Sequence, residues 1–455
     1  MELDFGKKLL QDKKFDEAKS FFLKELEKDN KSFRLYFFLG LTFFELNDFE
    51  KSIFYYKKSL KNYPNSVSIM LNLANAQYTV GNFLAAKSLY LKIIKLDIYN
   101  PRAYYGLYSL NPSFLEESHY SIITEIKNKK KIDLYENSLI EFLISKKYKL
   151  ENNKDLELIH LKNYHTLSFQ SNLKLNLQGL FYYDKIIYKH FNKVNFITKS
   201  TNLNLKSFTN LYPIFIVGLP RSGSTLIESI ISSAEVDIKS LGETSVINVS
   251  ILEQIKDTIF KDNFEEKKFN FNLNLELLVE SVYKKYNSYH QIPKTNFYFV
   301  DKSLENFFNV ELILKIFPNA VFIHCKRNYK DAIISIYNSM LPFLPWTHKL
   351  ENIIDYVDKY IKVTNFFEKK YPKNFLTVSL EELTNNQVDM TKKIFNFCNL
   401  EWSQKILKFY KRKNLNVKTL SNMQVRSEIF NYKKNKYASY LSLLNDFNKK
   451  FDWLN

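Results

Sequence analysis

A loop bounded by two glycines carries the residues best suited to binding an anion. It reads Gly218-Leu219-Pro220-Arg221-Ser222-Gly223-Ser224-Thr225. The apolar, β-branched and aromatic run 212–217 before it is typical of a buried parallel strand, and the apolar pattern of 226–231 after it predicts a helix. A strand, a glycine-bounded loop and a helix start point backbone N–H groups at an anion. The segment therefore predicts a phosphate-binding loop.

One position separates this loop from the P-loop of nucleotide triphosphatases. Two glycines separated by four residues and followed by a hydroxyl residue fit that template, but Ser224 stands where the template has Lys. That Lys reaches the β- and γ-phosphates, and the template's hydroxyl binds Mg²⁺. The loss of the Lys and the presence of Arg221 favour a smaller anion without a triphosphate tail.

The loop carries a family resemblance in five of its residues. Arg221, Ser222, Gly223, Ser224 and Thr225, after Pro220, resemble the 5′-phosphosulfate loop of sulfotransferases. The donor in that family is 3′-phosphoadenosine-5′-phosphosulfate, and no metal is implied. From Pro213 to the C-terminus, the order of segments is similar to that of bacterial sulfotransferases fused to tetratricopeptide repeats. The resemblance implies an α/β P-loop-type domain with a central parallel sheet over 208–455.

Two further predicted strands end in cations that the resemblance assigns to the donor. The strand 318–327 ends in Arg327, and the helix that follows contains Ser335; these two resemble the family's pair for the donor's 3′-phosphate. Arg offers phosphate a planar fork of donors, and Ser adds a neutral donor. The strand 297–301 is followed by Lys302, and in the family a Lys at such a place contacts the phosphosulfate. Alone, Arg327 and Ser335 would also fit a surface Arg and an ordinary helix Ser.

Two residues have expected roles that stay open. Glu243, in the segment 241–244, resembles the catalytic carboxylate of the tyrosylprotein branch of the family, where it would take the proton of an acceptor hydroxyl. A Glu in a polar loop is as often simply solvated. Arg426 follows a segment, 419–425, that is similar to one in the repeat-fused enzymes, and basic residues lie shortly after it. We expect Arg426 to close over the donor's phosphates or to belong to an exposed basic stretch.

The first hundred residues repeat themselves at a spacing of 34. Small residues recur in phase where the two helices of a hairpin approach closely, and aromatic residues recur where they fill the gap between hairpins. The in-phase sets are Gly6, Gly40 and Ala74; Phe15, Phe49 and Phe83; Ala18, Ser52 and Ala86; and Phe22, Tyr56 and Tyr90. This pattern resembles the tetratricopeptide repeat. We expect an all-α array of about three repeats and a partial unit over 1–110, followed by a helical connector over 111–207.

Composition limits the partners and the compartment. The chain has 455 residues, enough for two or three domains, and a net charge of +18 that is spread along it and forms no basic arm. We therefore expect no nucleic-acid partner. Two cysteines are typical of free thiols in a reducing compartment, and no apolar stretch is long enough to span a bilayer. These features predict a cytoplasmic protein without a membrane span.

Together these features predict an enzyme that moves a sulfuryl group from 3′-phosphoadenosine-5′-phosphosulfate to a hydroxyl of a protein tyrosine, a glycan or another acceptor. The repeats would dock a peptide, a protein partner or the substrate. One alternative is a P-loop nucleotide kinase or phosphotransferase, which a Mg²⁺ requirement for nucleotide binding would favour. The other is a non-catalytic repeat scaffold with a degenerate sulfotransferase domain, which nucleotide binding without turnover would favour.

Overall fold

The chain folds into two compact units. The computed structural model describes residues 2–197, 210–261, 265–290, 292, 297–412 and 415–454. The first unit comprises the N-terminal helices up to Ser171 together with the segment 415–423. The second unit contains most of the remaining residues.

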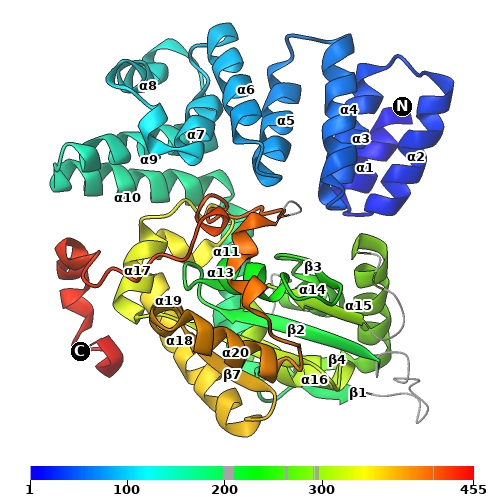
Figure 1. Ribbon diagram of the computed structural model, residues 1–455, viewed down its shortest axis with the longest axis vertical. Helices are drawn as coiled ribbons and strands as arrows, with labels where there is room; N and C mark the ends of the chain where they lie inside the picture. The colour runs from blue at the N-terminus through cyan, green and yellow to red at the C-terminus, as the bar shows by residue number, and fades with distance from the viewer. Residues whose placement is uncertain are drawn as a thin grey trace. The chain divides into compact units, whose positions relative to one another are not determined.

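The N-terminal helices form pairs that repeat with the predicted period (Figure 1). The first helices of successive pairs begin at 33, 67 and 101, and the second helices begin at 15, 49 and 83, which are steps of 34 residues. The helices are α1 (Glu2–Gln11), α2 (Phe15–Lys28), α3 (Phe33–Glu45), α4 (Phe49–Asn62), α5 (Val67–Thr79), α6 (Phe83–Leu96) and α7 (Pro101–Leu110). The predicted repeat array is confirmed.

The small residues of the period allow the helices of a pair to touch. A Cβ atom added at Gly40 would lie 2.5 Å from the ring of Tyr56, and one added at Gly6 would lie 2.4 Å from the ring of Phe22. Both rings are almost completely buried. The close approach therefore explains why small and aromatic residues recur at these phases.

A second periodic feature lies in the turn inside each pair. Lys13, Asn47 and Gly81 are also 34 residues apart, and their φ angles are 57°, 61° and 87°. A residue in the left-handed region is a common way to end a helix, because it lets the chain reverse while the last carbonyls find donors. Sequence analysis did not single out this position, because Lys and Asn reveal a positive φ less clearly than Gly.

Three further helices continue the first unit beyond the repeats: α8 (Glu117–Lys129), α9 (Leu134–Leu150) and α10 (Lys154–Ser171). Ile123 and Leu143 share one buried cluster with Tyr104 of α7. The next helix, α11 (Leu173–Phe181), belongs to the second unit. The helices expected as a connector over 111–207 are thus divided between the units, and residues 198–207 lie outside the described part. The boundaries 1–110, 111–207 and 208–455 remain a prediction.

A segment from the C-terminal part of the chain completes the first unit. We call residues 415–423 the strap. The Val417 N–H donates to the Thr79 carbonyl at 3.0 Å, and the Lys418 ammonium donates to the Phe44 carbonyl at 3.2 Å. Both carbonyls belong to the last turn of a helix, where they lack partners inside the helix and where a cation is favoured.

A five-stranded parallel sheet organises the second unit (Figure 1). Its strand order is β3-β5-β2-β6-β7. The strands are β2 (Leu211–Gly218), β3 (Ile238–Ser240), β5 (Phe297–Asp301), β6 (Val321–Lys326) and β7 (Phe375–Ser379). A separate parallel pair joins β1 (Asn195–Ile197) to β4 (Asn272–Asn274). The predicted fold class, a helical repeat array followed by an α/β domain with a central parallel sheet, is confirmed.

Helices and short 3₁₀ turns complete the second unit. The helices are α12 (Tyr188–His190), α13 (Ser224–Ile231), α14 (Val246–Ile259), α15 (Leu275–His290), α16 (Val310–Ile316), α17 (Tyr329–Tyr337), α18 (Leu350–Lys370), α19 (Leu380–Asn385) and α20 (Gln387–Phe397). Helix α13 contacts β2, and α18 and α20 contact β7. No helix in the described part of the chain is both long and apolar enough to cross a membrane.

The register of the sheet decides which residues meet at its edge. Phe215 of β2 pairs with Asp301, the last residue of β5, and Gly218 pairs with Cys325 near the end of β6. Because the strands are parallel, the segments that follow β2, β5 and β6 all leave the sheet at its carboxyl edge, and ligands of open α/β sheets bind at this edge.

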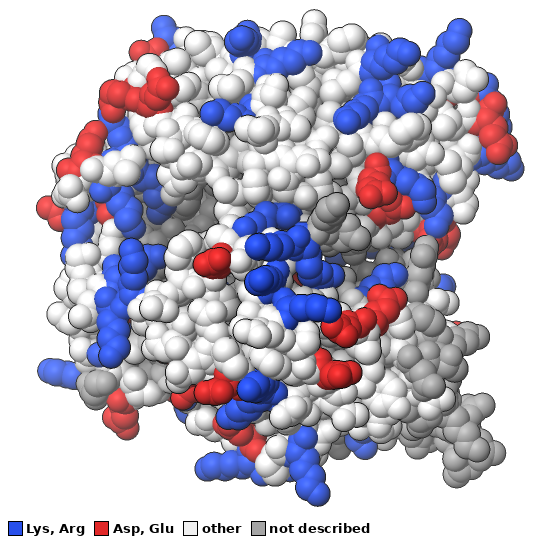
Figure 2. Space-filling model, viewed as in Figure 1, with Lys and Arg blue, Asp and Glu red and all other residues white. Residues whose placement is uncertain are grey.

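Lys and Arg side chains are scattered over the face seen in Figure 2, with Asp and Glu among them.

Candidate active site

The loop after β2 has the backbone conformation of an anion nest. Arg221 and Gly223 have φ angles of 67° and 86°, both in the left-handed region, and α13 begins at Ser224. Left-handed residues in such a turn, followed by the first amides of a helix, direct successive N–H groups to one point. Ser222 and Thr225 are buried within this turn. The predicted order of strand, loop and helix is therefore present, and anion binding by the loop stays a prediction.

Close packing holds the loop in place. A Cβ atom at Gly218 would lie 2.5 Å from the Cys325 carbonyl oxygen of β6, and one at Gly223 would lie 2.7 Å from a methyl group of Leu380. Leu380 is the first residue of α19. Both glycines therefore stand where a neighbour leaves no room for a side chain.

Arg327 and Ser335 come together beside the loop. Arg327 directly follows β6, and its Nη1 donates to the Arg221 carbonyl at 2.9 Å. Ser335 is buried in α17, and its Oγ accepts a hydrogen bond from the Tyr437 hydroxyl at 3.2 Å. The Arg327 guanidinium lies 5.6 Å from the ring centroids of both Tyr432 and Tyr437. Tyr437 thus joins the two residues predicted to bind the 3′-phosphate.

The environment of Tyr437 reveals a positive potential at this place. Burial alone would raise the pKa of its hydroxyl, but the bond to Ser335 and the nearby cations Lys436, Arg327 and Arg221 together hold that pKa below its usual value. Cations that favour a phenolate also favour a phosphate. Sequence analysis missed Tyr432 and Tyr437, because an aromatic residue in a basic stretch gives no signal of its own.

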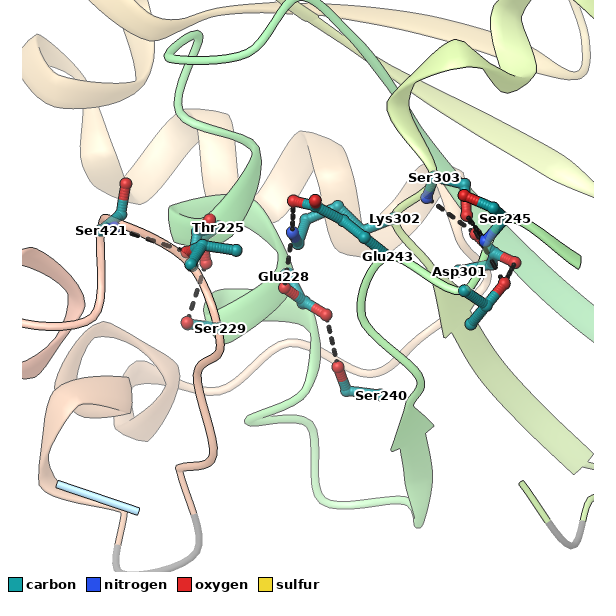
Figure 3. A network of polar contacts seen from close by, with 12 residues as sticks. Thr225, Glu228, Ser229, Ser240, Glu243, Ser245, Asp301, Lys302, Ser303 and Ser421 are labelled. Atoms are coloured by element: carbon teal, nitrogen blue, oxygen red, sulfur yellow. Dashed lines mark hydrogen bonds and ion pairs between the residues drawn. The ribbon is translucent and has the colours of Figure 1, made fainter. Parts of the chain in front are cut away.

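Lys302 and Glu243 form a direct ion pair. Lys302 follows β5, and its Nζ lies 2.7 Å from Glu243 Oε1 (Figure 3). The Lys302 side chain is 1% exposed, whereas that of Glu243 is 54% exposed. Burial opposes the charge on Lys302, but the neighbouring carboxylates outweigh burial and raise its pKa above the usual value. The predicted catalytic pair is therefore in contact, with a buried ammonium and an accessible carboxylate.

A second carboxylate, which sequence analysis did not single out, completes this group. Glu228 Oε2 lies 3.6 Å from Lys302 Nζ, and Glu228 Oε1 accepts a hydrogen bond from Ser240 at 2.6 Å (Figure 3). Burial raises the pKa of Glu228, although Lys302 opposes that shift. The available signal was its spacing: Glu228 lies three residues after Thr225, on the same side of α13.

Two segments of the chain match models of known protein families. Residues 213–404 match the model described as "Sulfotransferase family", and residues 33–66 match the model described as "Tetratricopeptide repeat". The chain carries a sulfotransferase-family domain.

Relatives of the chain add no assigned activity. An uncharacterized protein of Aquifex aeolicus is 28% identical over 234 residues, which cover 50% of this chain and 30% of that protein. The uncharacterized protein ycf37 of Guillardia theta is 30% identical over 76 residues, which cover 17% of this chain and 43% of that protein. The matches therefore span less than half the length of either relative.

Solved structures similar to the chain include two mycobacterial sulfotransferases. STF9 of Mycobacterium avium is 11% identical with a TM-score of 0.33, and the match covers 73% of this chain and 95% of that one. STF1 of Mycobacterium tuberculosis is 11% identical with a TM-score of 0.31, and the match covers 69% and 98%.

A hydrogen-bond network fixes the segment of the sulfotransferase domain that carries Glu243. Asp301 Oδ2 accepts from the hydroxyls of Thr244 at 2.7 Å and Tyr286 at 2.6 Å. Asp301 Oδ1 accepts from the Ser303 N–H at 2.7 Å, and both residues are labelled in Figure 3. The Ser303 hydroxyl in turn accepts from the Ser245 N–H at 2.8 Å. These bonds tie the chain around Glu243 to the chain around Lys302.

Arg426 lies at the end of the 3₁₀ turn η8 (Gln424–Arg426), which packs against α13. Its side chain is partly exposed. This places Arg426 on an element beside the helix that follows the loop. Its role in closing over phosphates remains a prediction.

The residues of the sulfotransferase domain fit an anionic nucleotide. The buried Ser222 hydroxyl and the buried Nε of Arg327 have no hydrogen-bond partner within the described residues. Buried polar groups are normally hydrogen-bonded, so an orphaned hydroxyl and an orphaned guanidinium N–H beside a nest point to a ligand that accepts hydrogen bonds. Within the same residues, no group of His, Cys, Asp or Glu is arranged to hold a metal ion.

Proposed function

We propose that this chain transfers a sulfuryl group from 3′-phosphoadenosine-5′-phosphosulfate to a hydroxyl group of an acceptor. One observation carries the proposal: Lys302 and Arg327 follow the two strands that flank β2 in the sheet, so both cations leave the sheet beside the loop. A nest with a cation on each side suits a nucleotide with anionic groups at both its 5′ and 3′ positions.

Each residue then has a binding role. The loop amides and the side chains of the loop hold the 5′-phosphosulfate; these residues are Arg221, Ser222, Gly223, Ser224 and Thr225. Arg327 and Ser335 hold the 3′-phosphate, and Arg426 closes over the phosphates from η8. Fixing the nucleotide at both ends keeps the sulfur in one place for an in-line attack.

The chemistry needs charge stabilisation and a base. A bond forms between the acceptor oxygen and sulfur while the bond between sulfur and the bridging phosphate oxygen breaks, and the desulfated nucleotide leaves. Lys302 stabilises the negative charge that gathers on the bridging oxygen. Glu243 accepts the proton of the attacking hydroxyl, a role that its exposed carboxylate can perform.

For the acceptor, we favour protein tyrosine, because the segment around Glu243 resembles the one that carries the catalytic carboxylate in the tyrosylprotein branch. The repeats serve to dock the substrate or a partner protein, as such arrays commonly do. We place the reaction in the cytoplasm, because Cys325 and Cys398 are both free and buried, as suits a reducing compartment.

Calorimetric titration with adenosine 3′,5′-bisphosphate tests the donor site. We expect the wild-type protein to bind it more tightly than adenosine 5′-monophosphate, and Arg221→Ala to bind neither measurably, because the variant loses the guanidinium beside the nest. Arg and Ala are both strained at the φ of 67°, so the substitution changes the side chain rather than the backbone preference. Unchanged binding by a folded Arg221→Ala protein would remove the loop from its role.

The kinase alternative makes a different prediction for the same titration. A nucleotide site that depends on Mg²⁺ would lose affinity when EDTA is added. We expect no change with EDTA. A large loss, together with preference for ATP, would favour phosphoryl transfer.

A further inference from the structure

Lys302 is one cation between two carboxylates. Two carboxylates, Glu228 and Glu243, lie within 3.6 Å of one ammonium group. A local excess of one negative charge at a partly desolvated place repels an incoming phosphosulfate. An anion that reaches Lys302 therefore competes with these carboxylates for the ammonium group.

The two carboxylates differ in how firmly they are held. The Glu228 side chain is 12% exposed, projects from a helix, and is fastened by Ser240 on β3. The Glu243 side chain is 54% exposed and lies in the loop that follows β3. If the ion pair with Lys302 breaks, water can readily solvate the exposed carboxylate of Glu243. The carboxylate of Glu228 would first have to leave its buried position. Glu243 is thus the partner that can be exchanged.

We propose that Glu228 is a positioning residue that keeps the ammonium of Lys302 in the site while Lys302 exchanges Glu243 for the anionic donor. The inference rests on the proposed function and goes beyond it, because it assigns a role to a carboxylate outside the residues proposed to bind the donor or to accept the proton. The proposal also links donor binding to proton transfer. When the anionic donor binds Lys302, Glu243 loses its ion pair. The freed Glu243 oxygen can then accept the proton of the acceptor hydroxyl.

Glu228→Gln tests this role, because it removes the charge and preserves the size. Without the charge of Glu228, the ammonium of Lys302 pairs with Glu243 alone. Glu243 then stays in this ion pair and is less able to accept a proton. We expect the rate of label transfer from radiolabelled donor to a whole-cell extract to fall about tenfold or more. Affinity for adenosine 3′,5′-bisphosphate should be unchanged or higher, because one negative charge has left the site. Glu228→Asp, which keeps the charge, should retain more of the rate than Glu228→Gln.

Glu253→Gln is the matched control. Glu253 also pairs with one Lys and one Ser, at 2.6 Å from Lys285 Nζ and 2.8 Å from Ser281 Oγ, but it lies on α14 and its side chain is 47% exposed. Its substitution should change neither binding nor transfer.

The outcomes separate the inference from the proposed function. If the wild-type protein neither binds the bisphosphate nor transfers label, the proposed function fails and the inference falls with it. If the wild-type protein does both and Glu228→Gln transfers label at the same rate, only the positioning role is overturned. A parallel loss of binding, transfer and thermal stability in Glu228→Gln would likewise overturn it, since that is the result of a merely structural carboxylate.

Discussion

Lys302 is a buried cation whose charge is compensated by neighbouring carboxylates. Its side chain is almost fully removed from solvent, and two carboxylates supply the interactions that water would otherwise provide. Removing one member of a buried ion pair leaves the other uncompensated, which costs more than the pair itself contributes. The stability of the domain and the chemistry that we propose for its site therefore depend on the same residue.

Lys302→Met should accordingly destabilise the protein by about 3 kcal/mol, because Glu228 is left buried without its cation. The double variant Lys302→Met with Glu228→Gln should recover part of that loss, since it leaves no buried charge. Urea denaturation of the two single variants and the double variant measures the coupling. A loss in the double variant equal to the sum of the two single losses would show that the pair does not interact.

Some site residues were predictable from sequence and others were not. Arg221, Lys302 and Arg327 follow predicted strands, so their type and place in the chain predicted that they would lie at one edge of the sheet. Glu228 and Tyr437 gave no such signal, because their contacts arise only when a helix and a distant C-terminal segment pack against that edge.

At the scale of elements, the loop between β2 and α13 needs a glycine at 223 for two reasons: the positive φ angle and the lack of space for a side chain. Gly223 and Gly242 both have positive φ angles, 86° and 70°. A Cβ atom at Gly223 would meet Leu380 at 2.7 Å, whereas nothing lies within 4 Å of one at Gly242. The two positions therefore separate the effect of a left-handed backbone from the effect of crowding.

Gly223→Ala should abolish measurable binding of adenosine 3′,5′-bisphosphate, because the loop must move away from α19 to admit the methyl group. Gly242→Ala should keep that binding and cost only the strain of a left-handed Ala, about 1 kcal/mol of stability. Calorimetry for binding and thermal melting for stability check both. Nucleotide binding by Gly223→Ala equal to that of Gly242→Ala would contradict the crowding argument.

The repeats show what periodicity can and cannot predict. The spacing of 34 residues predicted the helix pairs, because each pair buries the same small and aromatic positions. It did not predict where the helices beyond the repeats belong. Those helices share buried clusters with α7 through residues that follow no period, such as Ile123 and Leu143.

For the whole molecule, the contacts of the strap are the feature that the sequence predicted least. The segment around Thr419 and Ser421 resembles one in the repeat-fused enzymes, but this resemblance did not predict what the segment contacts. The structure places residues 415–423 within the first unit, more than 330 residues from α5 in sequence, where Asn422 donates to the Tyr78 carbonyl at 2.6 Å. A contact of such sequence separation follows from tertiary packing, which local patterns do not encode.

Lys418→Ala should loosen the strap. The Lys418 ammonium lies 4.6 Å from the ring centroid of Phe44 and 5.3 Å from that of Phe49, and burial lowers its pKa. We expect the Val417 amide, which donates to Thr79, to exchange with deuterium about fivefold faster in the variant, as a loss of about 1 kcal/mol implies. Lys405→Ala, at a side chain 88% exposed, is the control. Equal protection in both variants would show that Lys418 does not hold the strap.

The strap also sets a condition for whatever the repeats bind. The helix ends that it occupies already have a ligand, supplied by the same polypeptide at an effective concentration on the order of millimolar. An outside peptide that uses those carbonyls has to outcompete this tethered rival, so its apparent affinity falls below its intrinsic one. Any such displacement would free residues 415–423 from the helix ends of the repeats.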